Sequence, residues 1–362
     1  MRRPSLAVAG VLGLIVAALA APQVVLGHQL VGRVESPLPL VAYLAPPALA
    51  LALSFGFVIL RDVRAPAHPG TRPVTAPRWL TIGLRAVGLL AWLWIVVQTI
   101  VAGPNDDADV AVLFLWIYGW VLVAFLSALV APVWRWLDPF TTLYDLGAGA
   151  ARRLGIRGWE SSPYPDGLGQ WPAVAGLAFF VWLELAYKGG GLGLVMIGYT
   201  ILTLLAMVSF GRDAWRTNGE TFSVWFGTLN RLAPFGSASE IRAPSPDDRS
   251  LVRRRYAFGL LTRDWTTPRV ALVAIGVGSI LYDGLSQTQA WFNVFGAPFL
   301  PLATVELLIW LALVVGLALL VARLVGLAAV GGGLVPIAIG YLIAHYLTYV
   351  LGDGQKLVVA LS

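Results

Sequence analysis

The stretch PLATVELLIWLALVVGLALLVARLV, from Pro301 to Val325, decides the fold class of this chain. Only Glu306 and Arg323 are charged within it. A helix needs roughly 20 apolar residues to cross the hydrocarbon core of a bilayer, at about 1.5 Å per residue. A helix that is apolar all round must be buried in a core or in a membrane. We therefore predict that this stretch spans a membrane.

Seven other stretches have the same character. They are Leu38–Leu60, Arg78–Ala102, Val110–Pro132, Pro172–Tyr187, Leu192–Phe210, Val270–Leu285 and Ala329–Leu351. Hydrophobic residues make up 58% of the 362 residues and charged residues only 12%, against roughly 25% charged in a soluble domain. The connections are too short to bury a core of their own. The predicted fold is an all-α polytopic transmembrane bundle of about eight spans, within a single domain from 28 to 362.

The first 27 residues have the pattern of a targeting segment. Arg2 and Arg3 precede an apolar run. Ala18 and Ala20 offer one cleavage site, and Val25–Gly27 offer a second just before His28. We predict a signal peptide over 1–27, with an uncleaved signal anchor as the alternative. Cleavage would place the mature N-terminus outside the cell.

The basic residues then predict the orientation of the bundle. With the mature N-terminus outside, 22 of the 25 Lys and Arg residues lie on the cytoplasmic side or at inner helix ends, as the positive-inside rule requires. The connections 133–171 and 211–268 are then cytoplasmic. This topology accounts for the net charge of +6 without nucleic acid. The run Arg253–Arg255 is interpreted as a patch that faces lipid headgroups.

Both long cytoplasmic connections begin with aromatic, amphipathic stretches, 133–144 and 222–235. Trp and Arg interleaved in this way are typical of short interfacial helices. The two stretches share a loose Trp…Leu-x-Pro-Phe pattern that ends at Phe140 and Phe235. An internal duplication is one interpretation of this pattern.

Four ionisable residues lie inside predicted spans, namely Glu184, Asp283, Glu306 and His345. Such residues are costly in hydrocarbon and are functional candidates by default. Counted along their helices at about 1.5 Å per residue, all four reach the outer leaflet. We therefore predict that Glu184, Asp283 and His345 form one site, with catalytic or ligand-binding roles. Its predicted lining is Glu306, Tyr187, Tyr282, Tyr341 and Tyr349.

Several kinds of chemistry suit these side chains. Two carboxylates and an imidazole could ligate a divalent metal such as zinc or copper, which would activate a water molecule. The same groups could relay protons or bind a cation. Alternatively, they only cap helices or bond to Tyr and Trp neighbours. His28, if it becomes the mature N-terminus, could chelate zinc or copper through its amine and imidazole, or be an ordinary surface residue.

Several runs together resemble the bacterial fenitrothion hydrolase-like membrane proteins. They are His28–Arg33, Pro37–Pro39, Leu53–Phe55, Pro132–Asp138 with Pro139, Trp171–Ala173, Phe180–Leu185, Gly211–Val224, Tyr282–Leu285 and Ala344–Leu347. The resemblance implies hydrolysis of an organophosphorus triester, and it places Glu184, Asp283 and His345 on recurring motifs. Asp138 stands where that family has Asn, and the family continues beyond Ser362 into a further span.

Three function classes follow. The chain could be a metal-assisted hydrolase of lipophilic esters at the outer leaflet. It could instead be a transporter or channel that uses intramembrane carboxylates for protons or cations. A structural or assembly subunit is the third possibility. The expected partners are the lipid bilayer and a lipophilic small molecule or ion, and the expected location is a bacterial plasma membrane.

Overall fold

The computed structural model describes residues 71–101, 106–156, 161–187, 191–237, 248–262, 264–296 and 299–352. The predicted signal segment 1–27, His28 and the predicted span 38–60 lie outside these ranges. So do the last ten residues, 353–362.

Six helices in the described part of the chain are long and apolar enough to cross a membrane. They are α3 (Arg78–Val101), the continuous helix Val110–Leu129, α9 (Leu192–Phe210), α12 (Thr267–Ser286), α14 (Leu300–Val325) and α15 (Leu327–Gly352). The continuous helix consists of the second half of α4 (Asp106–Leu113), η1 (Phe114–Leu122) and α5 (Val123–Leu129). A shorter apolar helix, α8 (Trp171–Trp182), runs on into the π-helical turn η3 (Leu183–Tyr187). These helices support a multi-pass membrane protein. The count of eight spans stays a prediction.

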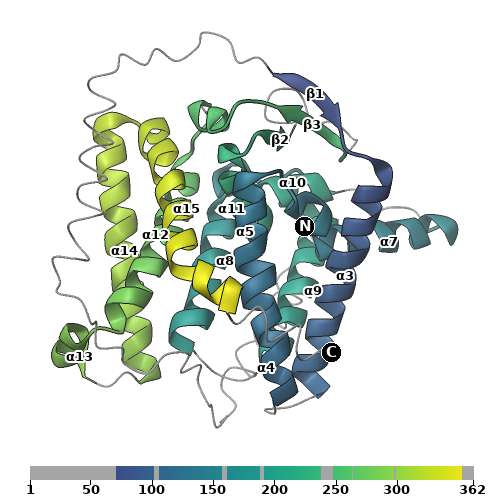
Figure 1. The fold of residues 1–362 in the computed structure, drawn as a ribbon. Coiled ribbons are helices and arrows are strands. Elements are labelled where there is room, and N and C mark those ends of the chain that lie inside the picture. The colour runs from purple at the N-terminus through teal and green to yellow at the C-terminus, as the bar shows by residue number, and fades with distance from the viewer. Residues whose placement is uncertain are drawn as a thin grey trace. The chain divides into compact units, whose positions relative to one another are not determined.

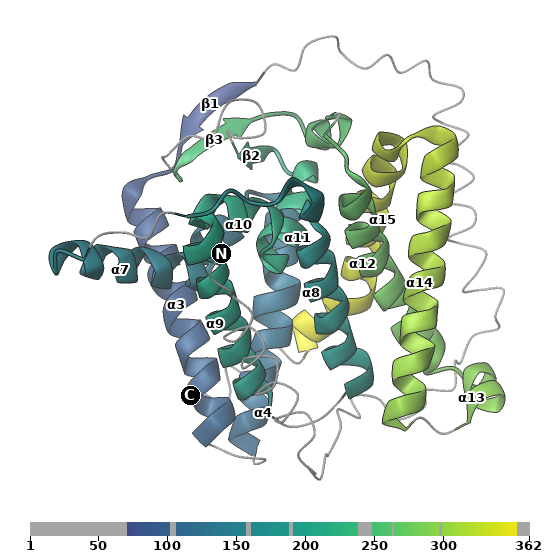
Figure 2. The same cartoon turned by 180° about the vertical axis from the view of Figure 1, so that it is seen from behind.

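Helix α12 lies at the centre of the bundle. It contacts α8, α14 and α15, and its residues from Val270 to Ala274 are fully buried. By contrast, α3 and α14 expose many apolar side chains, including Leu90 at 65% and Ile309 at 65%. Figures 1 and 2 show α14 and α3 on opposite sides of the other long helices. The outer helices therefore present the apolar surface that a bilayer would cover.

A small antiparallel sheet, not expected from the all-α prediction, covers one end of the bundle. Its order is β1 (Arg72–Thr75), β3 (Ser250–Arg253) and β2 (Phe235–Ser237). Val252 is paired with Pro73 on one side and with Gly236 on the other. Strands of three or four residues show no usable alternation of polar and apolar residues. We call this end of the bundle, at the top of Figure 1, the sheet end.

Short helices make up much of the rest of the sheet end. They are α6 (Trp134–Leu137), α7 (Pro139–Arg153), η2 (Asp166–Leu168), α10 (Arg212–Asn218), α11 (Thr221–Leu229), η4 (Asn230–Leu232) and η6 (Phe258–Leu261). At the opposite end, α13 (Gln289–Phe295) connects α12 to α14.

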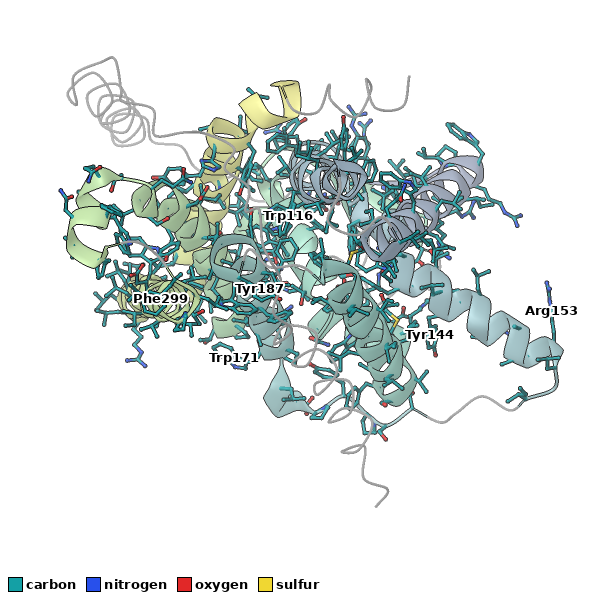
Figure 3. The ribbon with its side chains drawn as sticks, turned by 90° about the horizontal axis from the view of Figure 1, so that it is seen from below. Trp116, Tyr144, Arg153, Trp171, Tyr187 and Phe299 are labelled. Carbon is teal, nitrogen blue, oxygen red and sulfur yellow. The ribbon has the colours of Figure 1, made fainter. Side chains whose placement is uncertain are left out.

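The two predicted interfacial helices behave differently. Helix α7 buries its first turn, then runs sideways to Arg153 with Leu146 exposed at 59% (Figures 1 and 3), which suits a membrane interface. Helix α11 instead packs into the core through Trp225 and Phe226. The two stretches that share the Trp…Leu-x-Pro-Phe pattern also end differently, because Phe140 lies in a helix and Phe235 in a strand.

The interpretation of Arg253–Arg255 as one surface patch is wrong for its middle residue. Arg253 and Arg255 are exposed, but Arg254 is buried at 6% exposure. Its guanidinium donates to the carbonyl oxygens of Ala233, at 3.1 Å, and Asn230, at 2.7 Å. Arg254 therefore fixes the turn between η4 and β2.

Close packing of α12 depends on a glycine that faces a tryptophan. A Cβ atom added to Gly276 would lie 2.2 Å from Cη2 of Trp225. Trp225 itself is only 1% exposed and stacks on Trp120 with ring centroids 5.8 Å apart. Since the indole has no room to retreat, α11 can reach α12 only where the side chain is a hydrogen.

We predict that Gly276→Ala lowers the free energy of unfolding by about 1–3 kcal/mol, the usual cost of overpacking a core. Thermal unfolding of the detergent-purified protein measures the change. Gly316→Ala on α14 is the matched control, because an added Cβ meets nothing within 4 Å there. Equal melting temperatures for the two variants would contradict the close contact between α11 and α12.

Candidate functional site

Two helices that are long and apolar enough to span a membrane are joined by an imidazole–carboxylate pair far from the sheet end. His345 on α15 lies with Nε2 2.8 Å from Oδ2 of Asp283 on α12. The other oxygen of Asp283 accepts a hydrogen bond from the amide of Gln287 at 2.8 Å. Both side chains of the pair are largely but not fully enclosed, at 27% and 21% exposure. The pair therefore retains access from the bundle surface.

Glu184 belongs to the same region through its own partner. It lies in the π-helical turn η3, a rare backbone form that occurs often at functional sites. Its Oε1 accepts a hydrogen bond from the hydroxyl of Tyr346, at 2.9 Å. Glu184 also interacts electrostatically with Asp283 and His345. We call Glu184, Asp283, His345 and Tyr346 the intramembrane cluster.

Tyr346 links the two pairs of the intramembrane cluster. It follows His345 directly on α15, and the two rings meet edge to face with centroids 4.6 Å apart. Its sequence position gave no signal, because a residue next to His345 is turned by about 100° from it on a helix. The Glu184 carboxylate that the Tyr346 hydroxyl contacts lies in the π-helical turn η3. Tyr346 is thus a site residue that the sequence did not indicate.

Glu306 forms a separate buried group. Its Oε2 accepts hydrogen bonds from the indole of Trp291, at 3.1 Å, and from the hydroxyl of Tyr282, at 3.5 Å. Its Oε1 is buried and has no hydrogen-bond partner. Of the residues that the structure describes, those bonded to Glu306 are aromatic, and none belongs to the intramembrane cluster. The interpretation of Glu306 as bonded to Tyr and Trp neighbours fits this geometry.

The predicted lining residues have different surroundings. Tyr187 packs on Trp182 with ring centroids 5.1 Å apart, near the centre of the view from this end in Figure 3. Tyr341 is 40% exposed. The side chain of Tyr349, like His28, lies outside the described residues. The structure thus brings together Glu184, Asp283 and His345, and none of these contacts tests a catalytic role.

The fit of a metal ion to this region is poor. In the described ranges, no three His, Asp or Glu side chains are grouped so that they could hold a metal ion. Asp283 and His345 bond to each other, and Glu184 bonds to Tyr346. Zinc or copper at this site remains a prediction.

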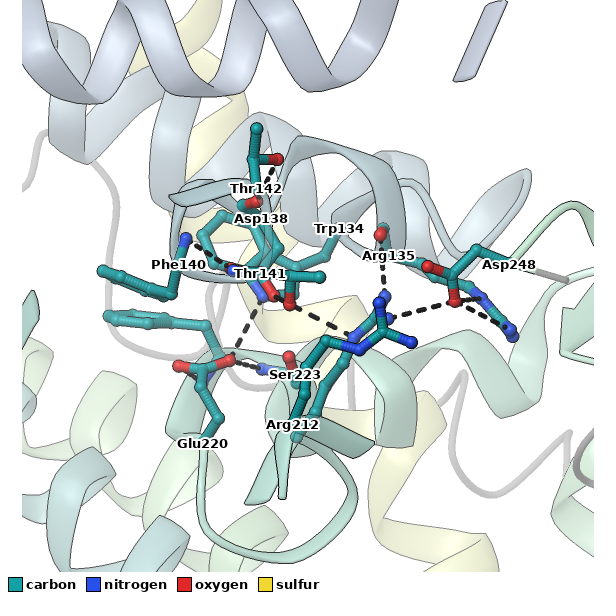
Figure 4. A network of polar contacts seen from close by, with 12 residues as sticks. Trp134, Arg135, Asp138, Phe140, Thr141, Thr142, Arg212, Glu220, Ser223 and Asp248 are labelled. Atoms are coloured by element: carbon teal, nitrogen blue, oxygen red, sulfur yellow. Dashed lines mark hydrogen bonds and ion pairs between the residues drawn. The ribbon is translucent and has the colours of Figure 1, made fainter. Parts of the chain in front are cut away.

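A second polar region lies at the sheet end, where two buried carboxylates cap two helices. Asp138 accepts from the backbone N–H groups of Phe140 and Thr141 and begins α7. Glu220 accepts from those of Phe222 and Ser223 and begins α11 (Figure 4). Carboxylates at the N-cap satisfy N–H groups that have no partner within the helix.

Glu220 has two further hydrogen-bond partners, and its charge interacts with that of Asp138. The indole of Trp134 and the hydroxyl of Tyr199 both donate to Glu220, at 3.3 and 2.7 Å. Burial raises the pKa of Glu220, and the negative charge of Asp138 raises it further. Burial likewise raises the pKa of Asp138, against the opposing charge of Arg216. The two carboxylates therefore interact electrostatically although 82 positions separate them in the sequence.

Asp248 gathers arginines from three separate segments of the sheet end. Its carboxylate pairs with Arg85 at 2.8 Å, Arg135 at 3.2 Å and Arg216 at 3.1 Å. Figure 4 shows Arg135 and Asp248 facing each other at the edge of this network. Burial acts to raise the pKa of Asp248, but the surrounding guanidinium groups outweigh it and lower the pKa. Asp248 is therefore held as an anion that ties α3, α6 and α10 together.

Sequence reasoning did not single out Asp138, Glu220 or Asp248 as site residues. One signal was available, because Asp138-Pro139 is a typical helix start, with a capping acid before a proline at the first helical position. Nothing comparable marks Asp248, whose arginine partners are far away in the sequence.

Comparison with protein-family models, with curated proteins and with solved structures finds no match to this chain. The resemblance to fenitrothion hydrolase-like proteins therefore remains a prediction.

We predict that Asp248→Asn destabilises the protein at neutral pH, because three guanidinium groups lose their shared counter-charge. The cost should stay below the roughly 3–5 kcal/mol of a fully buried pair, since Asp248 is 18% exposed. A carboxyl with a lowered folded-state pKa stabilises above its unfolded pKa of about 4 and loses that effect as the pH falls through the folded value. The difference in melting temperature from wild type should therefore shrink in acid.

Asp213→Asn is the matched control for this measurement. Asp213 also pairs with an arginine, Arg212, but its side chain is 67% exposed, so its removal should change the melting temperature little. A gap between Asp248→Asn and wild type that persists unchanged at acidic pH would show that charge is not the cause.

Proposed function

We propose that this protein is a membrane proton carrier in which the intramembrane cluster takes up and releases protons. The observation that carries this proposal is the contact of 2.8 Å between His345 on α15 and Asp283 on α12. Both helices are long and apolar enough to span a membrane. Ionisable groups within membrane-spanning helices are rare, pair with one another and mark proton or ion pathways.

The chemistry of the pair suits proton exchange. An imidazole is the side chain whose charge ordinarily changes between about pH 5 and 8. A protonated His345 beside an ionised Asp283 is neutral overall, so the pair can exist in hydrocarbon without a net charge. Loss of that proton would leave a net negative charge on the pair and make the contact between α12 and α15 less favourable.

Glu184 and Tyr346 provide a second acid–hydroxyl pair next to the first. The Tyr346 hydroxyl donates to Glu184, and the Tyr346 ring touches His345. A proton can therefore move among groups that come from α8–η3, α12 and α15. Because each proton transfer moves a positive charge from one helix to another, protonation can be coupled to helix movement.

The proposed orientation places the sheet end in the cytoplasm and the intramembrane cluster in the outer leaflet of a bacterial plasma membrane. The arginine distribution supports it: Arg85, Arg135, Arg212 and Arg216 all belong to the sheet-end network, and positive charge is retained on the cytoplasmic side. Protons would then enter the cluster from outside the cell.

We predict that proteoliposomes with the wild-type protein take up protons under an imposed pH gradient and an inside-negative potential. Asp283→Asn and His345→Gln should slow this uptake by at least about tenfold, since each removes a group that carries the proton. A pH-sensitive dye in the vesicle lumen measures the rate. Asp166→Asn, an exposed acid at the sheet end, should leave the rate unchanged.

Proton uptake equal to that of empty vesicles would refute the carrier proposal. Equal rates in Asp283→Asn, His345→Gln and wild type would refute the role of the intramembrane cluster. Circular dichroism and elution volume of each variant show whether a slow rate reflects misfolding instead.

A second candidate is a hydrolase of lipophilic esters. The same Asp283–His345 pair favours it, because a carboxylate that orients an imidazole is a common arrangement for a general base that activates water. The resemblance to fenitrothion hydrolase-like proteins points to organophosphorus triesters. Entry from the bilayer would suit such a substrate.

This second candidate predicts release of nitrophenol from a nitrophenyl phosphotriester by the purified wild-type protein. Loss of the base in His345→Gln should reduce turnover by roughly 100-fold, while Asp166→Asn retains it. The absorbance of nitrophenolate reports the rate. Turnover with no proton uptake would favour the hydrolase, and proton uptake with no turnover would favour the carrier.

A further inference from the structure

An open cavity of about 400 Å³ lies at the sheet end, beside the start of α3. Its walls come from α3, from α6, from α10 and from the residues just before β3. The residues that line it are Arg78, Thr81, Ile82, Arg85, Trp136, Arg212, Asp248 and Arg249. Four of these eight are arginines and only one is acidic, so the cavity is basic.

The charges around the cavity confirm this excess. Asp145 pairs with Arg85 at 2.9 Å and with Arg212 at 2.8 Å, and Asp213 pairs with Arg212 at 2.9 Å. Asp248 is shared among Arg85, Arg135 and Arg216. The six arginines in and around the cavity are Arg78, Arg85, Arg135, Arg212, Arg216 and Arg249. Against them stand Asp138, Asp145, Asp213 and Asp248, so positive charge exceeds negative charge even with all four ionised.

An apolar stripe on α3 leads away from the cavity. At about 100° per residue, Trp79, Ile82, Leu90, Leu93 and Val97 fall within one narrow face of the helix. All five side chains are exposed, from 44% for Leu93 to 75% for Trp79. Ile82 lines the cavity and also belongs to the stripe. A basic cavity thus continues directly into an apolar helix face.

We propose that this cavity binds the phosphate headgroup of an anionic phospholipid, with the acyl chains along the stripe from Ile82 to Val97. A guanidinium binds phosphate through a fork of parallel N–H donors. Basic pockets beside spanning helices on the cytoplasmic side attract anionic headgroups. The anionic headgroup of such a lipid complements the basic cavity, and its apolar acyl chains complement the stripe. This lipid site lies at the sheet end, and it does not depend on the proposed proton uptake by the intramembrane cluster.

The test uses the full-length protein, purified in detergent and incubated with equal amounts of phosphatidylglycerol and phosphatidylcholine. Native mass spectrometry counts the lipids that remain bound. Wild type should retain phosphatidylglycerol about tenfold over phosphatidylcholine. Arg78→Glu should reduce that retention about five- to tenfold, because it reverses one charge at the cavity.

Arg323→Glu is the matched control, since Arg323 is exposed in the last turn of α14 and does not line the cavity. The Arg323→Glu variant should retain as much phosphatidylglycerol as wild type does. If Arg78→Glu fails to fold, as judged by circular dichroism, Arg78→Gln replaces it, with a smaller loss expected in the same direction. Equal loss in the Arg78 and Arg323 variants would overturn the proposal, as would equal retention of the two lipids.

A third arm separates the lipid from a free anion. Inorganic phosphate at millimolar concentration should not displace phosphatidylglycerol, because it has no apolar part to occupy the stripe. Displacement by phosphate alone would assign the cavity to a soluble phosphate and overturn the lipid proposal. Leu93→Ser should weaken retention of phosphatidylglycerol if the stripe holds its chains, and an unchanged retention would contradict that part.

Discussion

The cost of an unpaired charge in hydrocarbon organises the polar side chains of this bundle. A bilayer core contains no water that could solvate a carboxylate or an imidazole, so each must find a partner within the protein. Asp283 meets His345, and Glu184 meets the Tyr346 hydroxyl. Each pair joins two different helices. The requirement for partners therefore fixes how α15 docks against α12 and against the end of α8.

The same requirement is met differently at the sheet end. There Asp138 and Glu220 are buried, and they accept hydrogen bonds from backbone N–H groups at the start of α7 and α11. Asp248 is surrounded by guanidinium groups instead. Helix caps and multiple ion pairs hold a fixed structure, because each carboxylate is bonded several times. The intramembrane pairs have fewer bonds and are more accessible, as the proposed exchange of protons requires.

Apolar packing and lipid contact divide the helices into two kinds. Helix α12 is buried along most of its length and accepts Trp225 only because position 276 is a glycine. Helix α3 is exposed along one face, and the basic cavity lies at its first turns. The inner helix therefore determines the geometry of the intramembrane cluster. The outer helix provides the surface through which the surrounding lipid meets the protein.

The sequence by itself determined the membrane class and the position of most helices, because the length of an apolar run and the thickness of a bilayer are local quantities. It also indicated Glu184, Asp283 and His345, since a charge in such a run is conspicuous without any structure. The tertiary structure alone decided their partners. Tyr346 and Asp248 are ordinary in sequence and gain their roles from groups on distant segments. The short sheet, the burial of Arg254 and the separation of Glu306 from the cluster arose in the same way, because long-range pairing leaves no periodic signal in the chain.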